Sequence, residues 1–160
     1  MTGKVFSINI GKEKGKPKDM VKFAIFQEGR GIEGDVHASG GGRQVSLLSI
    51  EEIEKVEMAG SASPDIDFRP GVFAENITTV GVELSKLKNG DTIQIGDSVV
   101  LKVTQIGKEC VSGCHIMQHV GRCIMPKQGV FALVQNGGTV NLNDRITLSR
   151  QKALFPWLKT

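Results

Sequence analysis

Residues 92–104 read T-I-Q-I-G-D-S-V-V-L-K-V-T, and this stretch indicates the fold most clearly. Its two halves, Thr92–Ile95 and Ser98–Thr104, are rich in the β-branched residues that strands favour. Gly96-Asp97 between them is a two-residue turn signal, and Asn89-Gly90-Asp91 marks another turn just before the first half. The sequence therefore predicts a β-hairpin made of short strands.

Short apolar runs separated by turn residues recur on both sides of this hairpin. We predict further strands or extended segments at Val5–Ile10, Met20–Phe26, Gln44–Leu48, Val72–Thr79, Gly129–Val134, Thr139–Leu142 and Arg145–Leu148. The chain has 20 glycines in 160 residues, which favours many turns over long helices.

One longer helix is predicted, and a local sequence signal marks its start. Ser49 and Glu52 form an S-x-x-E capping box, apolar residues follow at helical spacing up to Met58, and Gly60 ends the pattern. A single short helical turn is predicted at Leu84–Leu87. Many short strands with one or two short helices favour a mainly β fold, a closed or nearly closed β-barrel.

Composition narrows the class of protein. The length of 160 residues predicts a single domain over residues 1–150 with a C-terminal tail at 151–160. A net charge of +3 is too small to argue for nucleic acid as a partner. The sequence contains neither a long apolar run nor a signal-peptide pattern, so we expect no membrane span and a cytoplasmic location. In that compartment cysteines are free thiols or ligands rather than disulfides.

A glycine-rich segment, Gln27–Arg43, has six glycines among 17 residues and several ionisable side chains. It matches neither the phosphate-binding P-loop nor the dinucleotide fingerprint. Two interpretations stay open: a surface loop with turn glycines, or a binding loop for a polar or anionic ligand. The lysines at 12, 14, 16 and 18 are interpreted as an exposed solubilising loop, with an anion-steering patch as the alternative.

The stretch Val103–Met125 reads V-T-Q-I-G-K-E-C-V-S-G-C-H-I-M-Q-H-V-G-R-C-I-M and concentrates the soft nucleophiles of the chain. It contains all three cysteines, Cys110, Cys114 and Cys123, together with His115 and His119. Lys108 is near enough to Cys110 in sequence to lower the pKa of its thiol. Besides a reactive thiol at Cys110, two other interpretations of this stretch are a zinc or iron–sulfur site and a Cys–His catalytic pair. The C-x3-C spacing departs from common metal motifs.

Five segments in order resemble one known family. They are G-I-E-G-D-V-H-A at 31–38, R-Q-V-S-L-L at 43–48, R-P-G-V-F-A-E-N-I-T-T at 69–79, K-V-T-Q-I-G-K-E-C at 102–110 and G-V-F-A-L-V-Q-N-G-G at 129–138. Together they resemble the MOSC domain, named after the C-terminal domain of eukaryotic molybdenum cofactor sulfurases. The resemblance runs from about Lys4 to Leu148. The chain is similar to the small stand-alone bacterial form of this domain.

This resemblance implies a mostly β barrel and a signature cysteine shortly after a strand, which matches Cys110. In the family that cysteine is proposed to carry sulfur as a persulfide or to ligate molybdenum. Related members use a bound molybdenum cofactor, molybdopterin, to reduce N-hydroxylated substrates, so sulfur transfer and cofactor-dependent reduction are both implied activities. Pyridoxal phosphate belongs to a separate domain of the large sulfurases and is not expected in this chain.

The resemblance also suggests site residues and partners. Cys110 is the expected sulfur carrier or metal ligand, and Cys114 the expected resolving thiol. The expected cofactor-binding residues are Asp35, His37, Arg43, Glu75, Asn76 and Lys108. A cysteine desulfurase or a molybdoenzyme is the implied protein partner. The alternatives are a non-catalytic carrier or chaperone for the cofactor and a zinc-stabilised interaction module.

Two spatial expectations follow. The glycine-rich loop at 29–43 should lie beside Cys110, because one shared pocket would explain the polar composition of both segments. Cys123, which precedes Ile124, Met125 and Pro126, should pack at the start of the next strand and be dispensable for function.

Overall fold

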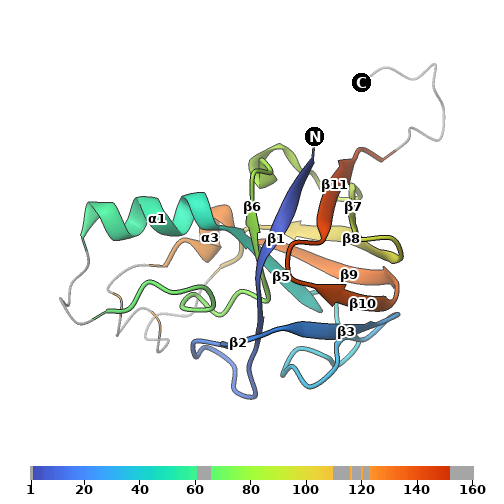
Figure 1. Ribbon diagram of the computed structural model, residues 1–160, viewed down its shortest axis with the longest axis horizontal. Coiled ribbons are helices and arrows are strands. Elements are labelled where there is room, and N and C mark those ends of the chain that lie inside the picture. The colour runs from blue at the N-terminus through green and yellow to red at the C-terminus, as the bar shows by residue number, and fades with distance from the viewer. Residues whose placement is uncertain (1, 61–65, 110–115, 117–119, 121–122, 152–160) are drawn as a thin grey trace.

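The computed structural model describes residues 2–60, 66–109, 116, 120 and 123–151. The described part is mainly β (Figure 1). Its strands are β1 (Thr2–Ile10), β2 (Asp19–Val21), β3 (Phe23–Gln27), β4 (Gly31–Ile32), β5 (Val45–Ser49), β6 (Ile77–Val80), β7 (Thr92–Ile95), β8 (Val99–Ile106), β9 (Val130–Asn136), β10 (Gly138–Asn141) and β11 (Arg145–Ser149). The helical elements among these residues are α1 (Ile50–Ala59), the 3₁₀ turn η1 (Leu84–Lys86) and α3 (Met125–Gln128).

The larger sheet closes into a barrel, which confirms the predicted fold class. Its strand order is β11-β7-β8-β9-β5-β6-β1-β2, and β1 also pairs with β11, so every strand of this sheet except β2 belongs to the closed ring. Neighbouring strands are antiparallel except β5 and β6, which run parallel and are joined through α1. A smaller sheet, β10-β3-β4, lies against the barrel (Figure 1).

The hairpin predicted at residues 92–104 is present as β7 and β8. Ile93 lies opposite Leu101, and Ile95 lies opposite Val99. All four side chains are fully buried in the barrel core. The alternating apolar residues of this stretch therefore face inward, as the two-residue period of a strand requires.

The side chains of β5 supply two separate cores. Val45 and Leu47 belong to the cluster that fills the barrel, whereas Leu48 belongs to a second cluster outside the barrel wall. This second cluster also contains Ile53 of α1 and Phe131 of β9. Every residue of β5 is buried for this reason, since both faces of the strand are covered.

The capped helix was predicted correctly. The Oγ of Ser49 accepts a hydrogen bond from the backbone N–H of Glu52 at 3.3 Å, and Gly60 caps the other end with φ of 83°. Ile50, Ile53 and Val56 are the buried residues of α1 and pack outside the barrel. Among the described residues there is no helix with the length and apolar character needed to span a membrane.

Two strand predictions need correction. Met20–Phe26 is two strands rather than one, because β2 pairs with β1 in the large sheet and β3 pairs with β10 in the small sheet. In Val72–Thr79 only the end is a strand, β6. The preceding residues turn around a buried carboxylate, since Glu75 accepts the backbone N–H groups of Gly71 and Phe73. Ala74 in this turn has a φ of 64°.

The interpretation of the lysine loop is wrong for one residue. Lys12, Lys14 and Lys16 are exposed, but Lys18 is fully buried. Its ammonium lies against the carboxylate of Asp35, which the glycine-rich loop brings back onto it. The alternation of lysine along this segment carries no sign of that long-range partner.

Candidate functional site

A pocket of about 510 Å³ lies on the outer side of the barrel wall. Two of its wall residues, Ser46 of β5 and Phe131 of β9, are directly opposite each other in the ladder. Their neighbours Val45, Leu47, Val130 and Ala132 fill the barrel. Because side chains alternate along a strand, Ser46 and Phe131 must leave the barrel on its outer face.

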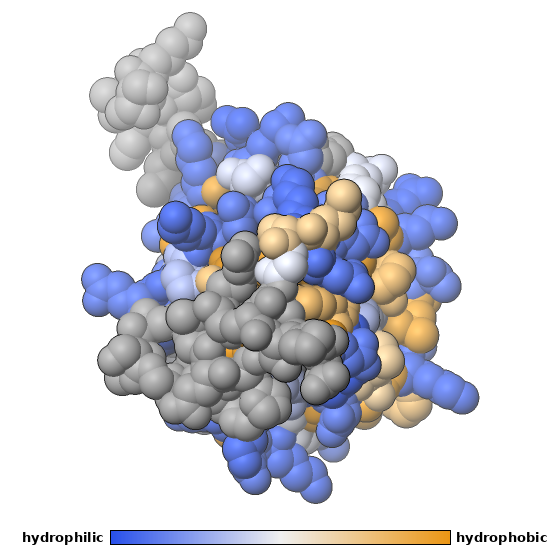
Figure 2. All heavy atoms as spheres, turned by 90° about the vertical axis from the view of Figure 1, so that its left-hand side faces the viewer, coloured by the Kyte–Doolittle hydropathy of each residue, from blue (hydrophilic) through white to orange (hydrophobic). Residues whose placement is uncertain are grey.

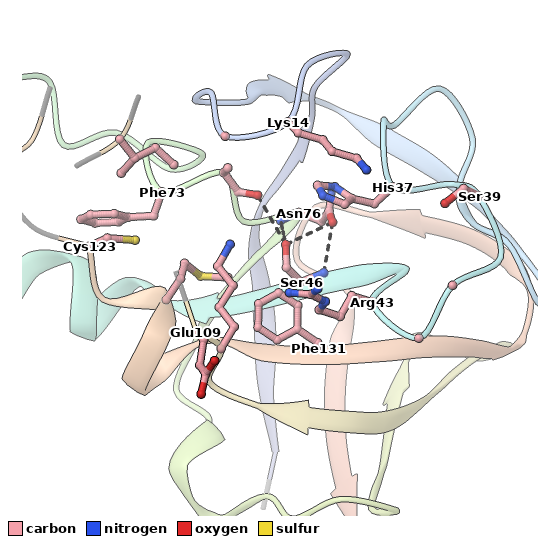
Figure 3. Close-up of a pocket in the computed structure, with 17 residues that line it drawn as sticks. Lys14, His37, Ser39, Arg43, Ser46, Phe73, Asn76, Glu109, Cys123 and Phe131 are labelled. Atoms are coloured by element: carbon pink, nitrogen blue, oxygen red, sulfur yellow. Dashed lines mark hydrogen bonds between the residues drawn. The ribbon is translucent and has the colours of Figure 1, made fainter. Parts of the chain in front are cut away.

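Loops from three parts of the chain complete the pocket (Figure 3). They are the β1–β2 loop, the glycine-rich loop, and the segments that follow β8 and precede β9. The turn before β6 adds Phe73, Ala74 and Asn76. The described residues that line the pocket are Lys14, Gly15, His37, Ser39, Gly41, Gly42, Arg43, Ser46, Phe73, Ala74, Asn76, Lys108, Glu109, Ile116, Cys123, Met125 and Phe131.

Positive charge dominates the polar lining. Lys14, Arg43 and Lys108 line the pocket, and Glu109 is the one carboxylate among its described lining residues. The Arg43 guanidinium and the Lys108 ammonium each lie 5.9 Å from the centre of the Phe131 ring. This distance is within the range of a cation–π contact, so the ring holds two cations at the same wall. The arrangement suits an anionic ligand.

The end of the pocket formed by Phe73, Ile116 and Met125 is apolar, since these side chains belong to the second hydrophobic cluster. Cys123 packs against the same cluster and is partly buried, but the element that follows it is the short helix α3, so its expected place at the start of a strand is wrong. The pocket therefore combines a cationic end with an apolar end, the combination typical of small-molecule sites. Figure 2 shows the face that lies at the left of Figure 1, where hydrophilic and hydrophobic residues adjoin outside the residues drawn in grey.

His37 points from the glycine-rich loop toward the interior of the pocket (Figure 3). Its side chain is 33% exposed, and its Nδ1 lies 3.2 Å from the Nζ of Lys18 and 3.4 Å from Oδ2 of Asp35. The imidazole thus has one edge on a buried ion pair and one side facing the pocket.

Asp35 does not line the pocket but anchors the loop that does. Its carboxylate contacts Lys18 Nζ at 2.9 Å and accepts the backbone N–H groups of Gly11 and His37, both at 3.0 Å. Burial alone would raise the pKa of Asp35, but the contact with the His37 side chain, the charge of Lys18 and the amide of Gly11 together hold it well below its usual range. Burial lowers the pKa of Lys18, against the raising effect of Asp35.

Glu75 and Asn76 hydrogen-bond the backbone that supports the pocket wall. Both side chains are fully buried, and only Asn76 reaches the pocket surface. Asn76 accepts the backbone N–H of Ser46 at 3.1 Å and donates its amide to the carbonyl of Asn9 at 3.1 Å, so it joins β5 to β1. Burial raises the pKa of Glu75 to about 7, although three hydrogen-bond donors, including the hydroxyl of Thr78, favour its ionised form.

Of the residues predicted from the sequence, the pocket brings together His37, Arg43, Asn76 and Lys108. Cys110, Cys114, His115 and His119 lie outside the described residues, so the expected neighbourhood of Cys110 and the glycine-rich loop stays a prediction. The chain just before Cys110 is described, and Lys108 and Glu109 line the same pocket as Gly41–Arg43. The hydroxyl of Thr104 in β8 also donates to the carbonyl of Gly42 and ties the two segments together.

Sequence reasoning missed several wall residues, notably Ser46, Phe73 and Phe131. Each looks like an ordinary strand or core residue in sequence. The ladder register that turns Ser46 and Phe131 outward is visible only in the fold. Within the described part of the chain, no three His, Cys, Asp or Glu side chains are grouped closely enough to hold a metal ion.

Comparison with known proteins agrees with this geometry. A search of the solved structures finds the YuaD protein from Bacillus subtilis with a TM-score of 0.77 at 22% identity, over 95% of this chain and 98% of that one. It also finds YiiM from Escherichia coli with a TM-score of 0.70 at 20% identity, over 96% of this chain and 72% of that one. YiiM from Geobacillus stearothermophilus matches with a TM-score of 0.68 at 20% identity, over 92% and 75% of the two chains.

At these identities the structural matches show the shared fold alone. No curated protein matches the chain in sequence. The profile of the MOSC domain, however, matches residues 34–147, which is most of the chain and includes the second part of the glycine-rich loop, from Gly34 to Arg43, and the wall strands β5 and β9. The chain therefore belongs to the MOSC domain family.

Proposed function

We propose that this pocket binds the molybdenum cofactor and that Cys110 handles sulfur or metal beside it. The proposal rests on the positive charge of the pocket. Its described lining contains three cations, Lys14, Arg43 and Lys108, and one carboxylate, Glu109. Molybdopterin is anionic through its phosphate, and membership of the MOSC family points to this cofactor among anionic ligands.

The residues present fit such a group in size and in charge. The volume of about 510 Å³ falls within the roughly 300–1,000 Å³ typical of small-molecule sites. Arg43 would hold the phosphate through paired N–H donors, which is the geometry that favours arginine over lysine for phosphate. Lys14 and Lys108 would add point charges, and Phe73 with Met125 would cover the apolar part of the ligand.

When bound, the cofactor would supply a redox-active molybdenum centre, and a soft thiolate such as that of Cys110 suits molybdenum as a ligand. As a sulfur carrier, the Cys110 thiolate would attack the outer sulfur of a donor persulfide. A new S–S bond forms on Cys110, the S–S bond of the donor breaks, and the donor leaves as a thiolate, with no net gain or loss of electrons. Lys108 would favour the thiolate form of Cys110.

One experiment separates the candidate functions. The purified protein is incubated with a cysteine desulfurase and cysteine, and its intact mass, bound pterin and zinc content are measured. A gain of sulfur that Cys110→Ser abolishes supports sulfur transfer. Bound pterin with no gain of sulfur indicates a carrier or a cofactor-dependent reductase, and turnover of an N-hydroxylated substrate by the loaded protein distinguishes these two. Stoichiometric zinc with neither sulfur nor pterin would overturn the proposal in favour of an interaction module.

A further inference from the structure

We infer that Lys18 is a positioning residue that holds His37 in one neutral tautomer, with the proton on Nε2, so that the pocket presents an N–H donor to an oxyanion. The choice of ligand rests on the proposed function. The tautomer does not, because it is a property of the protein without any ligand and can be measured in that state.

Lys18 has a partner for each of the three N–H donors of its ammonium. Its Nζ lies 2.9 Å from Oδ1 and 3.1 Å from Oδ2 of Asp35, and 3.2 Å from Nδ1 of His37. An ammonium has three N–H donors and no acceptor. A ring nitrogen in hydrogen-bond contact with it must therefore accept, and an accepting Nδ1 leaves the proton of the neutral imidazole on Nε2.

The buried charges favour this arrangement. Both side chains of the Lys18–Asp35 pair have 0% exposure, so neither charge is stabilised by water. The carboxylate of Asp35 is further held by the backbone N–H groups of Gly11 and His37, which stabilise its ionised form. An ionised Asp35 in direct contact keeps Lys18 as the ammonium, despite the cost of its burial.

The competing arrangement is weaker. A proton on Nδ1 of His37 could be donated to Oδ2 of Asp35, but that distance is 3.4 Å, longer than the 3.1 Å from Lys18 to the same oxygen. It would also set the Nδ1–H against the N–H groups of Lys18. The other charged groups at this site are Lys14, Arg43, Lys108 and Glu109, which line the pocket, and the buried Glu75, which acts on Lys18 through its charge.

The functional consequence is selectivity for an acceptor. A histidine free to exchange tautomers can either donate or accept at the pocket side. Fixed by Lys18, His37 donates only, which favours a phosphate or another oxyanion and disfavours a ligand that presents an N–H or O–H donor there. Lys18 thus acts on the ligand through His37 while lying fully buried itself.

The test is long-range ¹H–¹⁵N correlation NMR on protein with labelled histidine, recorded near pH 8, above the ordinary histidine pKa of about 6.5. The variant His37→Asn identifies the His37 signals among the three histidines. We expect wild-type His37 to show a single tautomer protonated at Nε2. In Lys18→Met, Asp35 loses its partner and takes the Nδ1–H of His37, so the pattern should reverse. A mixed pattern in wild type, or an unchanged one in Lys18→Met, would overturn the inference.

Two additions keep this test decisive. If Lys18→Met does not fold, the double variant Lys18→Met/Asp35→Leu replaces the pair by apolar groups, and His37 should then show both tautomers. Titration with inorganic pyrophosphate gives a separate readout, in which Lys18→Met should bind about tenfold more weakly than wild type, whereas Lys16→Met should bind as wild type does. A fixed tautomer without pyrophosphate binding would uphold the positioning role and count against the proposed cofactor site.

Discussion

Ser46 of β5 lies directly opposite Phe131 of β9, and both side chains leave the barrel on its outer face. The pocket is therefore built on the barrel wall and not within its core. Its cationic residues come from loops that cross this wall, while the apolar residues of β5 and β9 that fill the barrel point the other way. Ligand binding and barrel stability should thus respond to different substitutions.

Replacement of the two cations beside Phe131 should weaken anion binding and leave the fold intact. Arg43→Gln and Lys108→Gln each remove a charge that lines the pocket, and each should reduce pyrophosphate or cofactor affinity about tenfold. The free energy of unfolding should change by less than about 1 kcal/mol, since exposed cation–π contacts contribute little. Calorimetric titration and urea unfolding measure the two effects. Lys102→Gln, on the exposed side of β8, is the matched control and should retain wild-type affinity.

Removal of Lys18 should destabilise the protein strongly. Lys18→Met leaves the carboxylate of Asp35 buried without its partner, which costs on the order of 3–5 kcal/mol in urea unfolding. Lys16 pairs with Glu13 at the surface, so Lys16→Met should cost less than about 1 kcal/mol. Equal effects of the two substitutions would show that the buried pair is not a structural anchor.

Acid should weaken the same anchor. The pKa of Asp35 is lower in the folded protein than in the unfolded chain, so the folded state resists protonation of this group. Its contribution to the free energy of unfolding is present above the unfolded pKa near 3.8 and is lost as the pH falls below it. Wild type should therefore lose more stability between pH 5 and pH 3 than Lys18→Met/Asp35→Leu does. Parallel losses in the two proteins would contradict this assignment.

Glu75 should make the free energy of unfolding depend on pH in the opposite direction. Its pKa is near 4.5 in the unfolded chain and about 7 in the folded protein, so the folded state binds the proton more tightly between these values. The free energy of unfolding should fall as the pH rises from about 4.5 to 7, by on the order of 3 kcal/mol from this group, and then level off.

The measurement is urea unfolding at pH 5 and pH 8 for wild type, Glu75→Gln and Glu54→Gln. Glu75→Gln should remove this fall, although its amide meets the N–H groups of Gly71 and Phe73 and lowers stability at both pH values. Glu54 is exposed on α1, and its variant should retain the wild-type fall. A persistent fall in Glu75→Gln would assign the effect to another group.

Gly107, at the end of β8 and before Cys110, should not tolerate a side chain. It has a φ of 69°, and an added Cβ would lie 2.2 Å from the carbonyl oxygen of Pro126. Gly107→Ala should destabilise the protein by more than about 2 kcal/mol and weaken anion binding by shifting Lys108. Gly15 has a similar φ of 73° with no atom near its added Cβ, so Gly15→Ala should show only the backbone cost of roughly 1 kcal/mol. Similar losses in both variants would exclude a steric role for Pro126.

The cysteines should differ in function. Cys110→Ser should lose sulfur loading and cofactor retention. Cys123→Ser should keep both, because serine retains the size of the Cys123 side chain, which lines the apolar end of the pocket and is not the expected sulfur carrier. Intact mass and pterin content report the result for each variant. Loss in Cys123→Ser with full activity in Cys110→Ser would reverse the assignment, and loss of zinc from every cysteine variant would favour a metal site.

Much of the fold was predictable because its signals are local. The hairpin of β7 and β8 follows from Gly96-Asp97 between two strand-like runs, and the start of α1 follows from the Ser49 cap. The arrangement of the remaining strands was less accessible. The split of Met20–Phe26 between two sheets depends on pairing with β1 on one side and β10 on the other, which no local pattern specifies.

The sequence by itself determined a mainly β chain of the MOSC family, with a glycine-rich segment that carries ionisable side chains, among them Asp35, His37 and Arg43. Only the tertiary structure decided that Asp35 is an anchor and His37 a pocket residue, although they are two positions apart. It also decided that Lys18, one lysine in an exposed run, is buried. The reason is that burial depends on which distant residues the fold brings together: the partner of Lys18 is 17 residues away, and it reaches Lys18 only when the glycine-rich loop folds back onto the barrel.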